Sequence, residues 1–253
     1  MNDNFAHAHG TVMILAWMIF GSTGVLFARY GRVLRVGNQR QFLGKSIWFQ
    51  THRFLLSLSS LLILLGFFLI IIYRRGQWVS VAINGPILFT HSIVGSIIVC
   101  CIILQIWLAL YRCNPHSPFR FIFNWTHRIT GSLAFGFSFI NLFLIIFVLK
   151  QQHIALLIIV SLWTSWMIII VIFFELIQYQ YRKVSALMAR NARVSYTNQE
   201  GGNTNVQPDT EAGTNPTIEN QRLNKVKLFL FLIHIIISIV LSIPLIIIIW
   251  NQS

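Results

Sequence analysis

The sequence predicts an all-α protein, a bundle of six transmembrane helices. The mean hydropathy is +0.70 and only 10% of the residues are charged, whereas soluble domains carry about 25% charge. Six continuously apolar segments are long enough to cross a bilayer at about 1.5 Å per residue. Barrel strands are shorter and alternate in polarity, so helices are favoured. The six segments are 10–28, 54–73, 87–111, 129–149, 154–178 and 228–250.

The net charge of +13 is distributed unevenly between the loops. Of the 19 Lys and Arg residues, all but three lie in loops 29–53, 112–128 and 179–227. The positive-inside rule places these loops in the cytoplasm, so both termini are expected to be extracellular or lumenal. The basic excess therefore indicates a multi-pass protein of the plasma membrane or an endomembrane vesicle. The expected partner is the lipid membrane, and no nucleic acid is expected.

One histidine stands at the N-terminal edge of each of the first four segments: His9, His52, His91 and His127. Consecutive membrane helices run in opposite directions. His9 and His91 are therefore expected near one face, and His52 and His127 near the other. Two pairs of imidazoles, one per face, suit axial ligation of two haem irons. The spacing thus predicts a four-helix di-haem core for transmembrane electron transfer, although a single such histidine can also be an interfacial polar residue.

The third and fourth of these histidines share the pattern H-x-x-x-G, from His91 to Gly95 and from His127 to Gly131. Residues four apart lie on one helix face. The glycine can leave room for a flat porphyrin, or it can let a neighbouring helix approach closely. Both interpretations stay open on the sequence alone.

Each core helix carries one ligand candidate, since Thr23 follows His9 by 14 residues and Gly66 follows His52 by 14. Di-haem bundles of the respiratory cytochrome b and NADPH-oxidase type instead place two histidines on one helix. No G-x-G-x-x-G dinucleotide site follows a strand either. The expected electron donor is therefore a small diffusible molecule.

Arg53 and Arg128 directly follow the two histidines expected on the cytoplasmic side. They can anchor the helices on that side. Alternatively, a guanidinium can pair with a haem propionate or an anionic electron donor, because Arg matches carboxylates well. These two residues are the substrate-binding candidates.

Three further polar residues need a separate interpretation. His7 lies outside the apolar run and is a back-up ligand candidate. His234 lies inside the last segment and is expected to be packed and hydrogen-bonded. Glu175, near the cytoplasmic end of the fifth segment, is expected to extend to the membrane interface.

The chain divides into three parts. Residues 1–180 form the expected di-haem core and a fifth helix, and 227–253 form the sixth transmembrane helix. Residues 181–226 are expected to be a disordered cytoplasmic loop, because the stretch 191–224 is rich in Asn, Thr, Gly and Gln. Pro244 is expected to kink the sixth helix.

A family resemblance rests on four segments: His7-Ala8-His9-Gly10, Trp48-Phe49-Gln50-Thr51-His52-Arg53, Phe89-Thr90-His91-Ser92-Ile93-Val94-Gly95 and Asn124-Trp125-Thr126-His127-Arg128. Over roughly residues 5–180 the chain resembles the cytochrome b561 domain, in particular its ferric-chelate reductase 1-like, DOMON-associated branch. The resemblance implies two haem b groups and electron transfer from cytoplasmic ascorbate to ferric chelate or another extracellular acceptor. The implied enzyme is an ascorbate-dependent transmembrane ferric reductase, an oxidoreductase.

Two other functions stay open. The chain can be an electron-relay subunit for a separate extracellular redox domain, since members of this branch commonly carry DOMON or reeler domains. It can also be a haem-free polytopic transporter whose histidines bind protons or metal, although such sites gather near the bilayer midplane. A homodimer is compatible with each of these functions.

Overall fold

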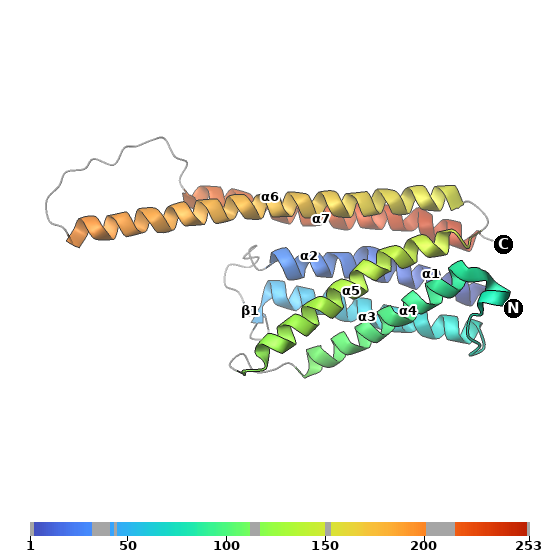
Figure 1. Cartoon of the computed structure of the whole chain (residues 1–253). Coiled ribbons are helices and arrows are strands. Elements are labelled where there is room, and N and C mark those ends of the chain that lie inside the picture. The colour runs from blue at the N-terminus through green and yellow to red at the C-terminus, as the bar shows by residue number, and fades with distance from the viewer. Residues whose placement is uncertain are drawn as a thin grey trace.

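The computed structural model describes residues 3–31, 41–42, 45–111, 117–149, 153–200 and 216–251. Within these ranges it is a bundle of long helices, which confirms the predicted all-α fold (Figure 1). Two-residue strands β1 (Gln41–Phe42) and β2 (Lys45–Ser46) pair antiparallel just before the second span. The helices in chain order are α1 (Asn4–Ile14), the π-helix η1 (Leu15–Gly21), α2 (Ser22–Tyr30), α3 (Ile47–Tyr73), α4 (Val81–Leu110), α5 (Arg120–Ile146), α6 (His153–Glu200) and α7 (Pro216–Trp250).

Six helical spans in the described part of the chain are long and apolar enough to cross a membrane, with α1, η1 and α2 forming the first. Five of the six begin at least five residues before the apolar runs that predicted them. Backbone groups inside a membrane must be hydrogen-bonded within the helix, so helix continues through the less apolar residues that flank each run. The four histidines therefore lie inside their helices, at least five residues after the start.

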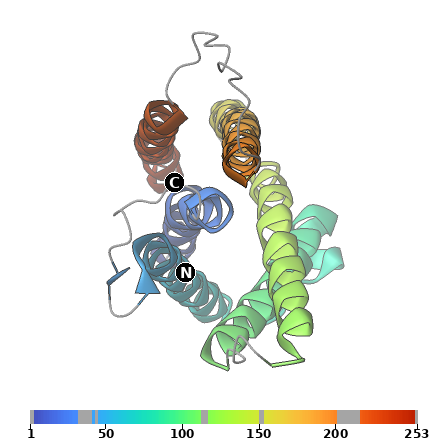
Figure 2. The same ribbon diagram turned by 90° about the vertical axis from the view of Figure 1, so that its left-hand side faces the viewer.

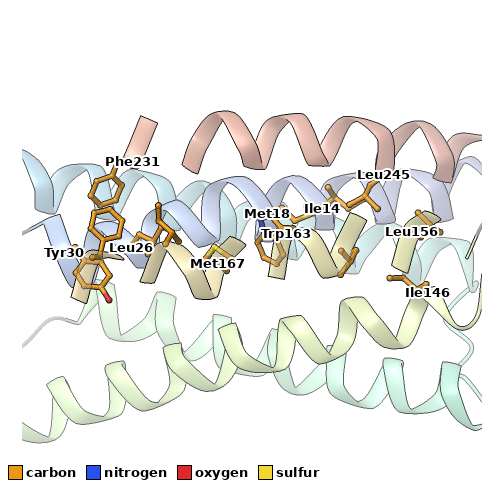
Figure 3. Packing of buried hydrophobic residues seen from close by; sticks show 13 residues of the cluster. Ile14, Met18, Leu26, Tyr30, Ile146, Leu156, Trp163, Met167, Phe231 and Leu245 are labelled. Carbon is orange, nitrogen blue, oxygen red and sulfur yellow. The ribbon is translucent and has the colours of Figure 1, made fainter. Parts of the chain in front are cut away.

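The first span is the central helix of the bundle. Half of its apolar window is buried, at 50%, against 17–28% in the other five spans. Viewed along the bundle, this helix lies between α3 and the α6–α7 pair (Figure 2). Its buried side chains pack on α6 and α7 in one cluster (Figure 3). The cluster includes Ile14, Met18, Leu26 and Tyr30 of the first span, Trp163, Met167 and Phe174 of α6, and Phe231 and Leu245 of α7.

The start of α1 and the end of α7 lie at the same end of the bundle (Figure 1). The indole Nε1 of Trp250 donates to the Thr11 hydroxyl at 2.9 Å, and the Trp250 ring contacts His7 edge-on with centroids 5.4 Å apart. A chain with an even number of antiparallel spans begins and ends at the same end of the bundle. The arrangement agrees with the sequence prediction that the two termini share one side.

The helices α6 and α7 extend past the ends of the other helices (Figure 1). In the stretch 181–226, which the sequence predicts to be a disordered loop, α6 continues to Glu200 and α7 begins at Pro216. Good helix formers such as Ala, Leu, Met and Arg are frequent at the start of that stretch, which favours continuation of α6. Residues 201–215 lie outside the described residues.

Proline acts differently in the two helices that contain it. α4 is broken before Pro86, where Gly85 has φ +79°, because the residue before proline avoids the helical region. The main part of α4 therefore starts close to residue 87, as the apolar run predicts. Pro244 lies within α7, which continues to Trp250.

Candidate haem-binding sites

The four candidate ligands lie on two antiparallel helix pairs. His9 on α1 and His52 on α3 belong to the first pair, in which the whole first span runs beside α3. His91 on α4 and His127 on α5 belong to the second pair (Figure 1). Because the helices of a pair are antiparallel, the two histidines of each pair lie toward opposite ends of it.

In the first pair, each histidine bonds to the backbone of the opposite helix. His9 Nδ1 lies 2.8 Å from the Gly66 carbonyl oxygen on α3. His52 Nδ1 lies 3.1 Å from the Gly24 carbonyl oxygen on α2. A carbonyl oxygen can only accept, so each Nδ1 carries the hydrogen and donates it. In each neutral ring the remaining lone pair is then on Nε2, which is the usual arrangement of metal-binding histidines.

The second pair repeats this arrangement with one variation. His91 Nδ1 donates to the Asn141 carbonyl oxygen on α5 at 3.2 Å. In the other direction, the Gln105 side chain on α4 donates from Nε2 to the His127 carbonyl oxygen at 2.8 Å and to the Thr130 hydroxyl. The His127 ring lies parallel to the Phe123 ring, with centroids 6.0 Å apart. The α4–α5 pair therefore fixes one imidazole directly and the other histidine through its backbone.

A constant spacing links each histidine to the partner residue on its own helix. Gly66 follows His52 by 14 residues, Gln105 follows His91 by 14, and Asn141 follows His127 by 14. After 14 residues an α-helix returns to nearly the same face. Each of α3, α4 and α5 therefore presents a histidine at one level and a hydrogen-bonding group at the other. On the sequence alone, the 14-residue spacing only excludes a second histidine on the same helix, and the partner role of Gly66, Gln105 and Asn141 is not predicted. The repeated offset itself is the signal that could have revealed them.

The first span departs from this spacing by one residue, because Gly24 follows His9 by 15. The π-helix η1 lies between the two. A π-helix closes its hydrogen bonds over five residues instead of four, so it absorbs an extra residue without changing the face that follows. η1 therefore brings Gly24 to the position that offset 14 gives in the other helices.

The π-helix is held by specific contacts. The Ser59 hydroxyl on α3 donates to the Ala16 carbonyl oxygen at 2.8 Å, and the Ser22 hydroxyl donates to the Met18 carbonyl oxygen at 2.7 Å. A Cβ on Gly21 would lie 2.8 Å from the Ala16 carbonyl oxygen. The last position of η1 thus requires glycine.

An apolar layer separates the two levels of histidines. Ile98 lies seven residues after His91 and seven before Gln105, and Ala134 lies midway between His127 and Asn141. Both belong to one buried cluster, which joins the two helix pairs at half height. Its buried members are Ala16, Trp17, Ile63, Ile98, Val99, Ile102 and Ala134.

The structure also relates histidines of different pairs. The helices α1 and α4 run in the same direction, so His9 and His91 lie toward the same end of the bundle (Figure 1). These are the two histidines predicted to share one face of the membrane. Their common level is therefore visible in the described residues.

The glycines of the two H-x-x-x-G motifs receive amide side chains from the neighbouring helix. A Cβ on Gly95 would lie 3.3 Å from Asn141 Nδ2, and a Cβ on Gly131 would lie 3.5 Å from Gln105 Nε2. Both glycines therefore face the other helix of their pair, and the porphyrin interpretation stays open.

The donor set and its surroundings fit haem. Three imidazoles are oriented by Nδ1, and at least one polar atom at each level is buried without a hydrogen-bond partner among the described residues. These atoms are the Asn141 Oδ1, on the residue that binds His91, and the Thr23 hydroxyl, beside the Gly24 that binds His52. Buried polar atoms of this kind indicate a place for a further polar group.

The two arginines beside His52 and His127 are exposed. Arg53 Nη1 lies 3.4 Å from Gln50 Oε1, and its guanidinium lies 5.8 Å from the centre of the Phe49 ring. Arg128 is exposed on α5, one residue after His127. Both side chains are therefore accessible at the same end of the bundle.

The other polar residues have assigned contacts. His234 is fully buried and bonded to Ser22 and Trp166, which confirms the packed, hydrogen-bonded role. Extension to the membrane interface stays a prediction for Glu175, whose side chain is 37% exposed. Its Oε1 lies 2.6 Å from Arg29 Nη2 and accepts from the Tyr30 hydroxyl at 2.9 Å, because α2 ends directly beside α6 and offers these two donors.

Comparison with known proteins confirms the resemblance to ferric-chelate reductase 1 proteins. The chain is 39% identical over 128 residues to mouse ferric-chelate reductase 1, covering 50% of this chain and 20% of that protein. It is 38% identical over 126 residues to the human protein of that name. A putative ferric-chelate reductase 1 homolog of Drosophila melanogaster is 30% identical over 161 residues, covering 64% of this chain and 22% of that protein.

These curated relatives are much longer than the part that aligns, and the chain spans about one fifth of their length. No family model matches the chain, and no solved structure matches it.

Proposed function

We propose that this chain is the membrane part of an oxidoreductase that carries electrons through two haem b groups. His9 and His91 bind the haem iron on the extracellular or lumenal side, and His52 and His127 bind the second iron on the cytoplasmic side. Electrons pass from cytoplasmic ascorbate to an extracellular acceptor such as ferric chelate. The observation that carries the proposal is the set of hydrogen bonds from Nδ1 of His9, His52 and His91 to backbone carbonyl oxygens of a neighbouring helix, which place the lone pair of each neutral ring on Nε2. The names of the relatives support ferric chelate as the acceptor.

The protein residues orient the ligands and exclude water. A hydrogen bond at Nδ1 fixes the plane of an imidazole and raises the basicity of Nε2. The carbonyl groups of Gly24, Gly66 and Asn141 do this for three of the four ligands. When bound, haem supplies one-electron redox chemistry at each level, which none of these side chains provides.

The two levels are suitably separated for a relay. Fourteen residues of helix correspond to about 21 Å along the axis. Soluble reactants on opposite faces of a membrane cannot approach each other over such a distance. Two haems within the span divide it into shorter steps, and the apolar layer around Trp17 and Ile63 keeps water from the region between them.

Donor capture belongs to the cytoplasmic level. Ascorbate is an anion at neutral pH, and Arg53 and Arg128 are exposed cations next to His52 and His127. We call the site of His52 and His127 the inner site, and the site of His9 and His91 the outer site. A guanidinium that pairs with the donor or a propionate holds the negative charge close to the inner site. The assignment of this end to the cytoplasm rests on the excess of Lys and Arg in its loops.

A second candidate is an electron-relay subunit that serves a separate extracellular redox domain. The length of the relatives favours it, since the chain aligns with only about one fifth of each. Ferric reduction by the purified chain distinguishes the two candidates. A relay subunit becomes reduced by ascorbate and stays reduced when an impermeant ferric chelate is added.

The experiment that tests the proposal is an absorption spectrum of the purified protein, with and without ascorbate. We expect low-spin b-type spectra and two haems per chain, with reduction by ascorbate. His52→Ala should remove one haem and His9→Ala the other, whereas His7→Ala serves as a control and should keep both. A colourless protein, or two haems retained in His52→Ala, contradicts the proposal.

A further inference from the structure

A buried polar cluster joins the last helix to the first span. His234 on α7 is 0% exposed, and its Nε2 lies 3.0 Å from the Ser22 hydroxyl on α2. The indole Nε1 of Trp166 on α6 lies 3.3 Å from His234 Nδ1. Three helices thus meet at one imidazole, although neither α6 nor α7 carries a proposed haem ligand.

The chemistry of the partners fixes the hydrogen positions. An indole N–H can only donate, so His234 Nδ1 accepts and the hydrogen of the neutral ring lies on Nε2. Nε2 then donates to the Ser22 hydroxyl, which in turn donates to the Met18 carbonyl oxygen at 2.7 Å. Both ring nitrogens are used, so His234 has no lone pair left for a metal. A fully bonded buried network of this kind makes its surroundings rigid.

The network ends at the segment that orients an inner ligand. Ser22 is the first residue of α2 and follows the last residue of the π-helix, Gly21. Gly24, in the same turn as Ser22, supplies the carbonyl oxygen that accepts from His52 Nδ1. Ser59 on α3 holds the opposite side of the π-helix through the Ala16 carbonyl. The turn is therefore held from α7 on one side and from α3 on the other.

We infer that His234 is a positioning residue of the inner haem site, acting through Ser22 and the Gly24 carbonyl on His52. This inference rests on the proposed function. A π-helix is a less regular segment than an α-helix and needs outside contacts to keep one geometry. The last helix supplies such a contact, and so it contributes to the inner site without touching the haem iron. The His52 hydrogen bond affects ligand basicity, and the redox potential of the iron depends on that basicity.

The test measures the midpoint potentials of both haems in the full-length protein by optical redox titration, together with low-temperature EPR spectra. His52→Ala and His9→Ala assign each potential to its haem. We expect His234→Leu to shift the midpoint and the EPR signal of the inner haem and to leave the outer haem unchanged. Ser22→Ala should reproduce that shift, and the double variant should add nothing to it. His234→Gln keeps a donor and an acceptor and should restore much of the wild-type value.

Ser238→Ala is the matched control. Ser238 is also fully buried on α7, one turn after His234, and its hydroxyl accepts from Trp163 Nε1 at 3.4 Å. A helix-packing effect would change this variant as much as the others, whereas we expect both of its potentials to stay at the wild-type values.

Unchanged inner-haem potentials in both His234→Leu and Ser22→Ala overturn the inference, as do equal shifts of both haems. Should His234→Leu fail to fold, the smaller Ser22→Ala change decides alone. A wild-type protein without haem overturns the proposed function itself.

Discussion

His52 and Gly24 form a hydrogen bond between two helices, with the imidazole Nδ1 3.1 Å from the carbonyl oxygen. The helices must approach closely for this bond, because a backbone carbonyl cannot extend toward its donor as a side chain can. Gly24 allows that approach through its missing side chain, and Leu56 of α3 lies directly against it. The same close approach makes this position sensitive to substitution.

Gly24→Ala should displace α3 and weaken the inner haem site. The added Cβ would lie 2.6 Å from Leu56 Cδ2, 2.9 Å from Leu56 Cγ and 3.3 Å from Leu55 Cβ, and overpacking of this kind costs about 1–3 kcal/mol. Gly66→Ala is the comparison, since its Cβ would meet the flexible side chain of Met13, with Cε at 2.9 Å. Haem content and thermal unfolding in detergent measure both effects. Equal loss in the two variants would contradict the prediction.

Gly21→Ala should disturb the π-helix. Its Cβ would lie 2.8 Å from the Ala16 carbonyl oxygen, which is backbone and cannot rotate away. We expect a loss of about 1–3 kcal/mol in the free energy of unfolding. Gly136→Ala in α5 is the control, because its Cβ would meet nothing within 4 Å. There the better helix propensity of alanine should be neutral or stabilising by up to about 1 kcal/mol, and a destabilisation as large as that of Gly21→Ala would refute the steric explanation.

Glu175→Gln should have a small effect on stability. The side chains of Arg29 and Glu175 are 65% and 37% exposed, and ion pairs this exposed contribute about 0.2–1 kcal/mol. The amide oxygen of glutamine can still accept from the Tyr30 hydroxyl, which further limits the loss. The salt dependence of the unfolding temperature separates the charge effect from packing. A loss well above 1 kcal/mol would show that the carboxylate does more than join α2 to α6.

Arg53→Gln and Arg128→Gln should slow reduction by ascorbate if these guanidinium groups hold the anionic donor. Loss of one charge-assisted hydrogen bond weakens capture by about 1–3 kcal/mol, roughly 5- to 150-fold. The measurement is the rate of haem reduction per haem at low ascorbate concentration. Anchoring alone predicts reduced expression with unchanged rates, so wild-type rates in both variants would remove the donor role.

Protease treatment tests the proposed orientation. The loops at the end of the bundle opposite the two termini hold most of the Lys and Arg residues, so we expect the connection between α6 and α7 to face the cytoplasm. In sealed right-side-out vesicles, this connection should resist external protease and become cleavable after permeabilisation. Cleavage before permeabilisation would reverse the orientation.

Much of this protein follows from the sequence alone. Long apolar runs determine the number of spans, because a membrane helix must be apolar over about 20 residues whatever its neighbours are. Helices one and three run in the same direction and each carries its histidine at the N-terminal edge of its apolar run, which places His9 and His91 at one level. These features depend on local composition and on the thickness of a bilayer, and both can be read from a linear sequence.

Contacts between helices were decided by the tertiary structure. The ion pair of Glu175 with Arg29 and the bond from His234 to Ser22 depend on which helix lies beside which. The π-helix is the clearest case: its sequence is ordinary and apolar, and the need to bring Gly24 opposite His52 exists only when α3 is in place. The sequence by itself determined the spans and the level of each histidine, whereas rotation and register of each helix were set by packing, because in a uniformly apolar helix every face is equally able to meet lipid.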